Sequence, residues 1–346
     1  SLTNLAMQEQ TLNLKFEHEY EKKAFEDSVN YAKSQELNVI KLREQKAQIQ
    51  KAKTQRYALY GGIGIMFIFG AFAFRTYHRK KRDHDIIQLQ HQELEGSHFE
   101  IQQSIHYAKR LQDVFLPSSE TLNQHFSSHF TLFKPKDVVS GDFYWFSEIK
   151  GKKIVAAIDC TGHGVPGAMV SVVCNNGLNR SVREYGLSDP GKILDKTREI
   201  VISEFEKSED EVKDGMDIAL CSLENNTLQY SGAHNPLWII RNGSEEVEEI
   251  KADKQPIGKF AQSTSFITHE IQLNKGDCIY IFSDGYSDQF GGEKGKKFKT
   301  ANFKKLLLSI QNEPMIKQRQ IIDQSFENWR GSLEQLDDVC VIGVKI

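Results

Sequence analysis

The stretch YALYGGIGIMFIFGAFAF, Tyr57 to Phe74, contains no charged residue and is bracketed by Arg56 and Arg75. As an α-helix, these residues would extend roughly 27 Å, close to the hydrocarbon core of a bilayer at about 30 Å. Tyr57, Tyr60 and Tyr77 stand where aromatic anchors occur at membrane interfaces. A buried core helix is the alternative, but basic residues at both ends disfavour it. We therefore predict a single membrane span over residues 57–74.

Basic residues occur on both sides of this predicted span. Lys46, Lys51 and Lys53 precede it, and the segment RTYHRKKR, residues 75–82, follows it. The positive-inside rule is nearly balanced between the two sides. The orientation therefore has to come from the chemistry of the C-terminal part.

The segments that flank the span are both expected to be helical. Residues 1–56 contain no proline and no glycine, and their apolar stripe could close a sensor or repeat domain lying upstream. Residues 75–118 form a predicted juxtamembrane linker, helical over 83–115 and ended by Pro117. Apolar residues recur there at intervals of seven: Ile87, Leu94, Ile101, Ala108 and Phe115. This coiled-coil-like spacing favours a homodimer, and a helix that packs on the following domain remains the alternative.

Residues 119–346 change to short apolar runs separated by turns, which predicts an α+β domain. The expected strands lie in KKIVAAID, IALCSLE, LQYSGA, PLWIIRNG, SFITHEIQL, DCIYIFSDG and DVCVIGVKI, and helices are expected at about 165–184, 190–206 and 301–329. Consecutive strands joined by short turns favour two antiparallel sheets flanked by helices. The five cysteines show no metal-binding spacing, so we expect free thiols. A net charge of −3 offers no support for nucleic-acid binding.

Carboxylates stand at the ends of several predicted strands. Asp159 follows the run Ile154 to Ile158 and precedes the glycine-rich turn CTGHGVPG. Asp142 follows Gly141, Asp284 precedes Gly285, and two aspartates precede the final strand: Asp337 and Asp338. Oxygen ligands of this kind suit Mg²⁺ or Mn²⁺ rather than Zn²⁺. Two such ions can activate a water molecule for attack at phosphorus without a protein nucleophile. Asp159 is therefore predicted to be a metal ligand.

The motifs SGDFYWF, DCTGHGVPGA, YSGAHNPLWII, QPIGK, FSDGYSDQF and LDDVCVIGV occur in this order. Together they resemble the SpoIIE-like branch of the type 2C (PPM) protein serine/threonine phosphatases, over about residues 105–346. The resemblance implies a PPM-type sandwich of two antiparallel sheets with a site for two Mn²⁺ or Mg²⁺ ions. It also implies hydrolysis of phosphoserine or phosphothreonine.

The resemblance further implies roles for individual residues. Asp159 would bridge both ions, and the backbone carbonyl of Cys160 would assist one of them. Asp142, Asp284 and an aspartate before the last strand would complete the coordination. Alignment on that strand favours Asp337, with Asp338 next to it as the other candidate.

Some positions depart from the wider PPM pattern or are weaker candidates. Classical PPM phosphatases have a histidine, a candidate general acid, two residues after the bridging aspartate. Here that position is Thr161, and His163 lies four residues after Asp159. We find no counterpart of the phosphate-binding arginine, and Lys134 or Lys136 could supply positive charge instead. Further acidic candidates are Asp217 and Asp288.

These features together predict a membrane-anchored phosphatase with its C-terminal domain in the cytoplasm, where phosphoproteins and Mg²⁺ are found. The resemblance suggests a phosphorylated regulatory protein as substrate, such as an anti-sigma factor antagonist. A catalytically silent signalling scaffold and a metal-dependent hydrolase of small phosphate esters are the alternatives.

Overall fold

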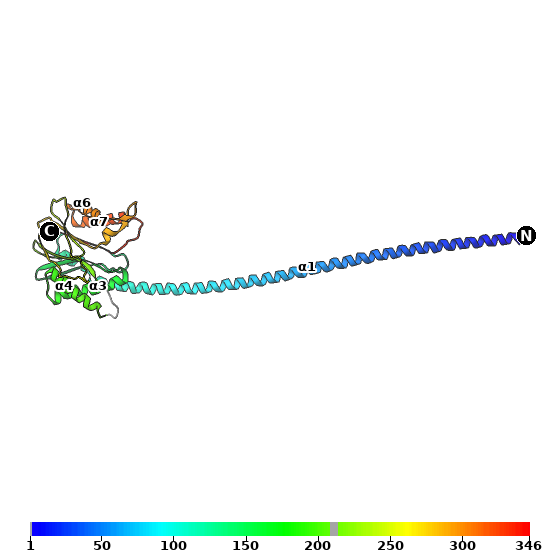
Figure 1. The fold of residues 1–346 in the computed structure, drawn as a ribbon, viewed down its shortest axis with the longest axis horizontal. Coiled ribbons are helices and arrows are strands. Elements are labelled where there is room, and N and C mark those ends of the chain that lie inside the picture. The colour runs from blue at the N-terminus through cyan, green and yellow to red at the C-terminus, as the bar shows by residue number, and fades with distance from the viewer. Residues whose placement is uncertain (1, 208–213) are drawn as a thin grey trace. The chain divides into compact units, whose positions relative to one another are not determined.

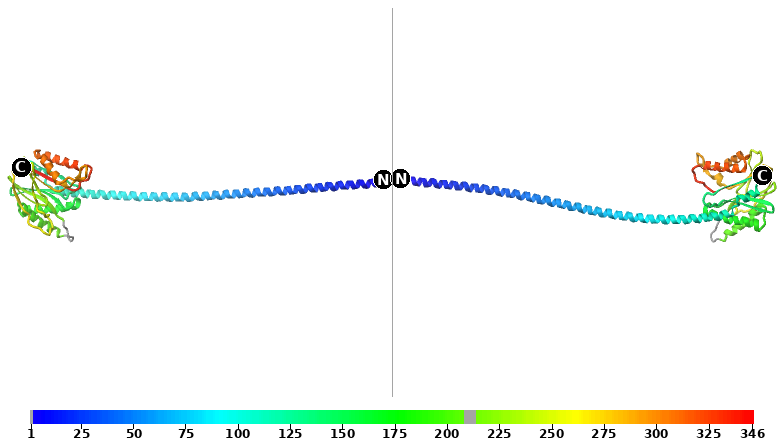
Figure 2. Two further views of the ribbon diagram at one scale, coloured as in Figure 1. Left: turned by 45° about the horizontal axis from the view of Figure 1, so that its top comes forward. Right: turned by 180° about the vertical axis from the view of Figure 1, so that it is seen from behind.

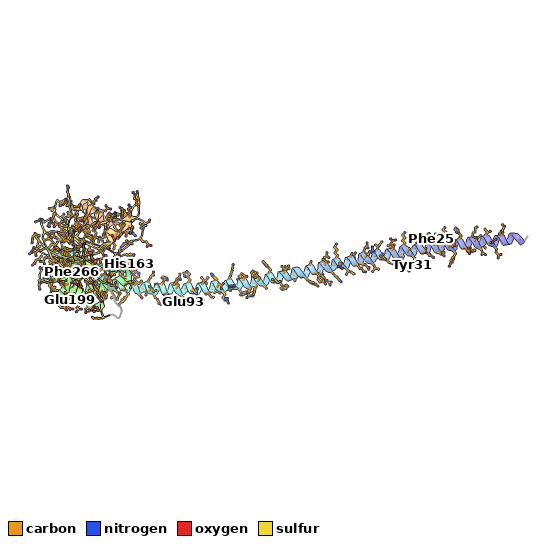
Figure 3. The ribbon with its side chains drawn as sticks, in the orientation of Figure 1. Phe25, Tyr31, Glu93, His163, Glu199 and Phe266 are labelled. Carbon is orange, nitrogen blue, oxygen red and sulfur yellow. The ribbon has the colours of Figure 1, made fainter. Side chains whose placement is uncertain are left out.

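A computed structural model describes residues 2–207 and 214–346, which form two compact units, Ser1–Glu95 and Gly96–Ile346. The described residues of the first unit, 2–95, are all helical, because they belong to helix α1, which runs over Leu2–Phe115. Aromatic side chains such as Phe25 and Tyr31 stand out from this helix into solvent (Figure 3). Among the described residues, α1 is the one helix that could cross a membrane, on length and apolar composition alone.

The second unit contains two five-stranded antiparallel sheets, as the sequence predicted. The strand order in one sheet is β2 (Phe143–Ile149), β3 (Lys152–Cys160), β4 (Met216–Glu224), β5 (Thr227–Ala233) and β8 (His269–Gln272). In the other sheet the order is β1 (His129–Lys134), β12 (Val339–Lys345), β9 (Cys278–Phe282), β6 (Leu237–Ile240) and β7 (Glu248–Ile250). A separate small hairpin pairs β10 (Phe290–Gly291) with β11 (Lys296–Lys297).

Helices cover the outer face of each sheet. α3 (Gly164–Asn179) and α4 (Pro190–Phe205) lie on one side of the sandwich, and α6 (Thr300–Ile310) and α7 (Met315–Arg330) lie on the other (Figures 1 and 2). Short helices α2 (Ser119–His125) and α5 (Gly285–Asp288) complete the unit, and α3 continues into a π-helical turn at Arg180–Glu184. The result is a four-layer arrangement of helices, sheet, sheet and helices.

Alternating side chains in β3 show why these layers form. Ile154, Ala156 and Ile158 pack in the core shared with α3 and α4. Val155 and Ala157, which point the other way, belong to the core between the two sheets. Because successive strand residues face opposite sides, a strand buried on both faces has to be apolar throughout. The run IVAAI meets that requirement.

Two expected elements differ from the structure. The helical stretch expected over about 301–329 consists of two helices, α6 and α7, and Pro314 stands at the N-terminal cap of α7. The strand expected in SFITHEIQL is shorter, His269–Gln272. Strands β1, β7 and hairpin β10–β11 were not predicted. The cysteines are all free and buried, as expected: Cys160, Cys174, Cys221, Cys278 and Cys340.

Candidate active site

Four aspartates line one pocket of about 300 Å³ at the strand ends. Asp159 is the next-to-last residue of β3, and Asp217, the second residue of β4, is its direct partner across the antiparallel pair. Asp284 follows β9 and Asp337 precedes β12, and these two strands are also antiparallel neighbours. Because antiparallel pairing brings the end of one strand beside the start of the next, each sheet delivers two carboxylates to the pocket.

Burial and mutual repulsion disfavour the charged form of these groups. Burial, followed by the charges of Asp284 and Asp217, raises the pKa of Asp159 well above its usual range. Burial raises the pKa of Asp217 to about 6; the His234 imidazole acts in the opposite direction and Asp284 adds to the rise. Burial also raises the pKa of Asp284, with Asp288 and Asp337 contributing. A cation in the pocket would offset this repulsion and favour the charged form of the carboxylates, so the arrangement favours cation binding.

Asp142 is almost completely buried beside this pocket, with 2% of its surface exposed. Its Oδ2 atom has no hydrogen-bond partner among the described residues. Burial and the charge of Asp159 raise the pKa of the Asp142 carboxyl well above its usual range, while a hydrogen bond from Ser283 acts against the rise. A buried carboxylate oxygen without a partner is costly unless a proton or a cation is supplied.

The donor set of the pocket fits a hard divalent cation. The four acidic side chains that line the pocket offer carboxylate oxygens as ligands. The thiol of Cys160, which also lines the pocket, is neutral, because burial raises its pKa well above the usual range. Across residues 2–207 and 214–346, no three His, Cys, Asp or Glu side chains are placed so that they could hold a metal ion together. Mg²⁺ suits carboxylates spaced in this way, because that ion binds through one or two protein carboxylates and keeps several waters.

The two neighbouring aspartates before β12 have different environments. Asp337 lines the pocket. Asp338 is 1% exposed, and its carboxylate accepts backbone hydrogen bonds from Lys136 at 2.7 Å, Gly141 at 2.8 Å and Asp142 at 3.4 Å. Asp338 therefore holds the segment that carries Asp142, and its oxygens already have partners.

Glycines bring three backbone segments together beside Asp159. A Cβ atom on Gly141 would lie 2.2 Å from the Gly162 carbonyl oxygen, and one on Gly167 would lie 2.1 Å from the same atom. Gly162 itself has a φ of +83°, a conformation that favours glycine. The motif glycines thus pack the turn after β3 against the Asp142 segment and the first turn of α3.

His163 lies at the N-terminal cap of α3, where Figure 3 marks it, and does not line the pocket. Lys136 Nζ donates to His163 Nε2 at 2.9 Å, so the ring proton is on Nδ1, which lies 2.9 Å from Asp137 Oδ2. Thr161, at the position where the classical PPM pattern has a histidine, bonds instead to the backbone of Gly215.

The remaining predicted positions have other partners. Asp288 is not a lining residue and binds Lys297 Nζ at 2.7 Å. Lys134 is held by Asp323 and Glu327 on α7, so it is not free to meet a phosphate.

The sequence did not single out Gln112, near the end of α1. This residue is buried, its Nε2 atom donates to Ser140 O at 2.6 Å and to Ser171 Oγ at 3.2 Å, and its Oε1 atom accepts from Ser140 N at 3.0 Å. A glutamine in a polar helix carries no pattern that reveals burial. The bonds place the last turns of α1 in direct contact with the segment that leads to Asp142.

The family model of stage II sporulation protein E (SpoIIE) matches residues 150–346, more than half of the chain. The chain belongs to the SpoIIE family. This membership and the sandwich fold make its C-terminal unit a PP2C-type, metal-dependent protein serine/threonine phosphatase domain.

Solved structures agree with this SpoIIE-family assignment. The SiaA-PP2C domain of Pseudomonas aeruginosa is 28% identical, with a TM-score of 0.65 over 72% of this chain and 98% of that one. The PP2C phosphatase domain with a regulatory fragment of SpoIIE from Bacillus subtilis is 22% identical, with a TM-score of 0.51 over 63% of this chain and 62% of that one. The second match supports the fold alone. A comparison with curated proteins found no match.

Proposed function

We propose that this SpoIIE-family chain is a membrane-anchored phosphatase that hydrolyses phosphoserine or phosphothreonine on a regulatory protein, using two Mn²⁺ or Mg²⁺ ions. The observation that carries the proposal is the convergence of Asp159, Asp217, Asp284 and Asp337 on one pocket. Divalent ions bound there would supply Lewis-acid activation of water and neutralise charge on the phosphoryl group.

The chain's own residues would divide the remaining work. Asp159, at the centre of the carboxylate repulsions, would hold both ions, with the Cys160 carbonyl assisting. Asp284 and Asp337 would complete the coordination from the second sheet, and the unpartnered Oδ2 of Asp142 would contribute from its buried side. Asp338 would position the Asp142 segment through its backbone hydrogen bonds instead of binding an ion.

His163 is suited to a positioning role in this site. Its ring accepts from Lys136 and faces Asp137 with the opposite nitrogen, which fixes the orientation of the imidazole. Both partners belong to the segment held by Asp338, so His163 would tie the start of α3 to that segment.

The membrane and dimer parts of the proposal rest on α1. The uncharged segment 57–74 would span the bilayer, with residues 75–346 in the cytoplasm, where a phosphoprotein substrate is available. The linker would form a homodimer, although Phe115 cannot join its seam, because the ring packs against Phe143 with centroids 5.9 Å apart. The apolar residues Ile87, Leu94 and Ile101 remain exposed.

The substrate is proposed to be a phosphorylated regulatory protein such as an anti-sigma factor antagonist. One solved structure, of the RsbU and RsbW domains of a Mycobacterium tuberculosis protein, matches this chain with a TM-score of 0.50 and 18% identity. That match is a similarity of fold.

Phosphate release by the purified full chain in detergent tests the function. Phosphoserine and phosphothreonine peptides should be hydrolysed with Mn²⁺ or Mg²⁺ and not with chelator. Hydrolysis of p-nitrophenyl phosphate without any peptide hydrolysis would favour an esterase of small molecules. No hydrolysis of either substrate with intact metal binding would favour a silent scaffold. Reporter fusions before Arg56 and after Arg82 test the orientation, and equal cytoplasmic signals from both would exclude a single span.

A further inference from the structure

A lysine-rich segment follows the candidate active site in sequence. Between Gly292 and Lys305 the chain carries one acidic residue, Glu293, and six lysines: Lys294, Lys296, Lys297, Lys299, Lys304 and Lys305. Hairpin β10–β11 presents the first three, all of them exposed. Among the described residues, Lys297 pairs with Asp288 and Lys304 with Glu249, whereas Lys294, Lys296 and Lys299 have no ion-pair partner.

The hairpin is fixed firmly to the end of α7 by Trp329. Gly292 N donates to Trp329 O at 2.8 Å, and Trp329 Nε1 donates to Gln289 O at 3.0 Å. A Cβ atom on Gly291 would lie 1.8 Å from Trp329 O, so the two backbones are in close contact. The edge of Phe298 meets the Trp329 ring with centroids 5.3 Å apart. The lysines therefore stand on a rigid support.

The same segment is connected directly to the carboxylate pocket. Lys297 Nζ lies 2.7 Å from Asp288 Oδ2, on the short helix α5 that directly follows Asp284. Lys299 N donates to Ser287 O at 2.8 Å, with Lys299 at a φ of +71°. A lysine in this region of φ is strained, and its surroundings hold it there. Positive charge is thus built in beside the place where the phosphate would bind.

An open groove of about 690 Å³ continues from the hairpin along α7. The groove is lined by Phe298, which follows the hairpin, and by Trp329, which contacts it, and Ile321 adds a further apolar side chain. The rest of the lining is polar and includes one cation, Lys317, and no carboxylate: Gln320, Gln324, Ser325 and Asn328. The groove can accept an extended segment with alternating apolar and polar or acidic side chains.

We propose that hairpin β10–β11 and the adjoining groove dock an acidic segment of the phosphoprotein substrate, with carboxylates near the phosphorylated residue. This inference rests on the proposed phosphatase function and adds its substrate class. Charge complementarity carries it: the pocket itself repels anions until cations occupy it, and the unpaired lysines supply the local attraction for an acidic chain. Their contribution is largest in the rate of association and is screened by salt.

Phosphoserine peptides of one length, with acidic, neutral or basic residues flanking the phosphoserine, test the inference on the full chain in detergent with Mn²⁺. We expect kcat/KM to be about three- to tenfold higher for the acidic peptide than for the neutral one, mostly through KM. The preference should shrink in high salt. A variant with Lys294→Gln and Lys296→Gln should lose most of it, and Lys296→Glu should favour the basic peptide. The matched control, Lys192→Gln with Lys275→Gln, removes the same charge from exposed positions outside the hairpin and should keep the preference.

Two results of the peptide assay would overturn the docking inference. One is equal kcat/KM for the three peptides; the other is a preference that the hairpin variants retain in full. Reconstitution into anionic and neutral nanodiscs adds a third: if the hairpin lysines change activity only on anionic lipid, they bind a membrane and the substrate assignment is wrong. Failure of the phosphatase function itself is distinguishable, because then no peptide and no p-nitrophenyl phosphate is hydrolysed by the parent protein.

Discussion

Gln112 and Ser140 form a reciprocal pair, in which the glutamine amide binds both the N–H and the C=O of one backbone residue, at 3.0 Å and 2.6 Å. Ser140 is fully buried and lies two residues before Asp142. The pair therefore connects two parts of the protein. One is helix α1, which comes from the predicted span, and the other is the segment that carries Asp142, a predicted metal ligand. Any rotation or displacement of the end of α1 would act on the segment that carries Asp142.

Replacing Gln112 with alanine should weaken both the fold and metal binding. The change leaves buried polar atoms of Ser140 without partners, at a cost of about 1–3 kcal/mol in the free energy of unfolding. The Asp142 segment also loses its support, so the Mn²⁺ concentration for half-maximal activity should rise. Gln103→Ala, on an exposed position of the same helix, is the control. Identical Mn²⁺ titrations for Gln112→Ala and the parent would show that the end of α1 does not support metal binding.

Asparagine at Asp159, Asp284 or Asp337 should lower phosphatase activity by ~100-fold or more, because one ligand of the metal site is lost. In chelator, the Asp159→Asn protein should be more stable than the parent, because one repelling charge is removed. We expect a gain of about 1 kcal/mol in the free energy of unfolding, which raises Tm by ~2–4 °C. It should also gain less stability from added Mn²⁺. Glu245→Gln, on an exposed loop, should change neither property. Near-parent activity in all three variants would contradict the proposed site.

The neighbours Asp337 and Asp338 should respond differently to alanine substitution. Asp337→Ala should abolish Mn²⁺-dependent activity with little change in Tm, because this residue lines the pocket. Asp338→Ala removes the acceptor for backbone N–H groups of Lys136, Gly141 and Asp142 and should cost about 2–4 kcal/mol in the free energy of unfolding. Thermal denaturation beside activity assays decides the assignment. An active Asp337→Ala with a stable but inactive Asp338→Ala would reverse it.

Deletions in the linker should reveal whether helix phase controls activity. Removing residues 88–91 turns the helix by about 400°, a net offset of roughly 40°, whereas removing 88–94 nearly restores the original face. We expect the first deletion to change the phosphatase activity of the protein in membranes strongly and the second to change it little. A two-state linker needs only a few kcal/mol of bias to shift between arrangements. Equal rates for both deletions and the parent would make the linker a passive tether.

Local pattern was enough to determine much of this protein. The apolar run of β3 is buried on both faces, so its composition alone predicts a central strand, and the carboxylates stand out because they interrupt or end such runs. The uncharged segment 57–74 and the proline-free flanks likewise predict helix, since helix formation depends on neighbouring residues along the chain. The order of the motifs indicated a resemblance to the SpoIIE-like phosphatases, and the SpoIIE family model confirms this family.

Tertiary structure decided what depends on residues far apart in the chain. Asp337 and Asp338 are chemically identical neighbours, and only the folding of residues 136–142 against Asp338 separates a pocket carboxylate from a buried backbone acceptor. Asp217 gained importance because β4 pairs with β3 in the register that places it opposite Asp159. Gln112 gained its role because α1 ends against Ser140. In each case, hydrogen bonds and charge repulsion between distant segments assign the role, and no local periodicity records them.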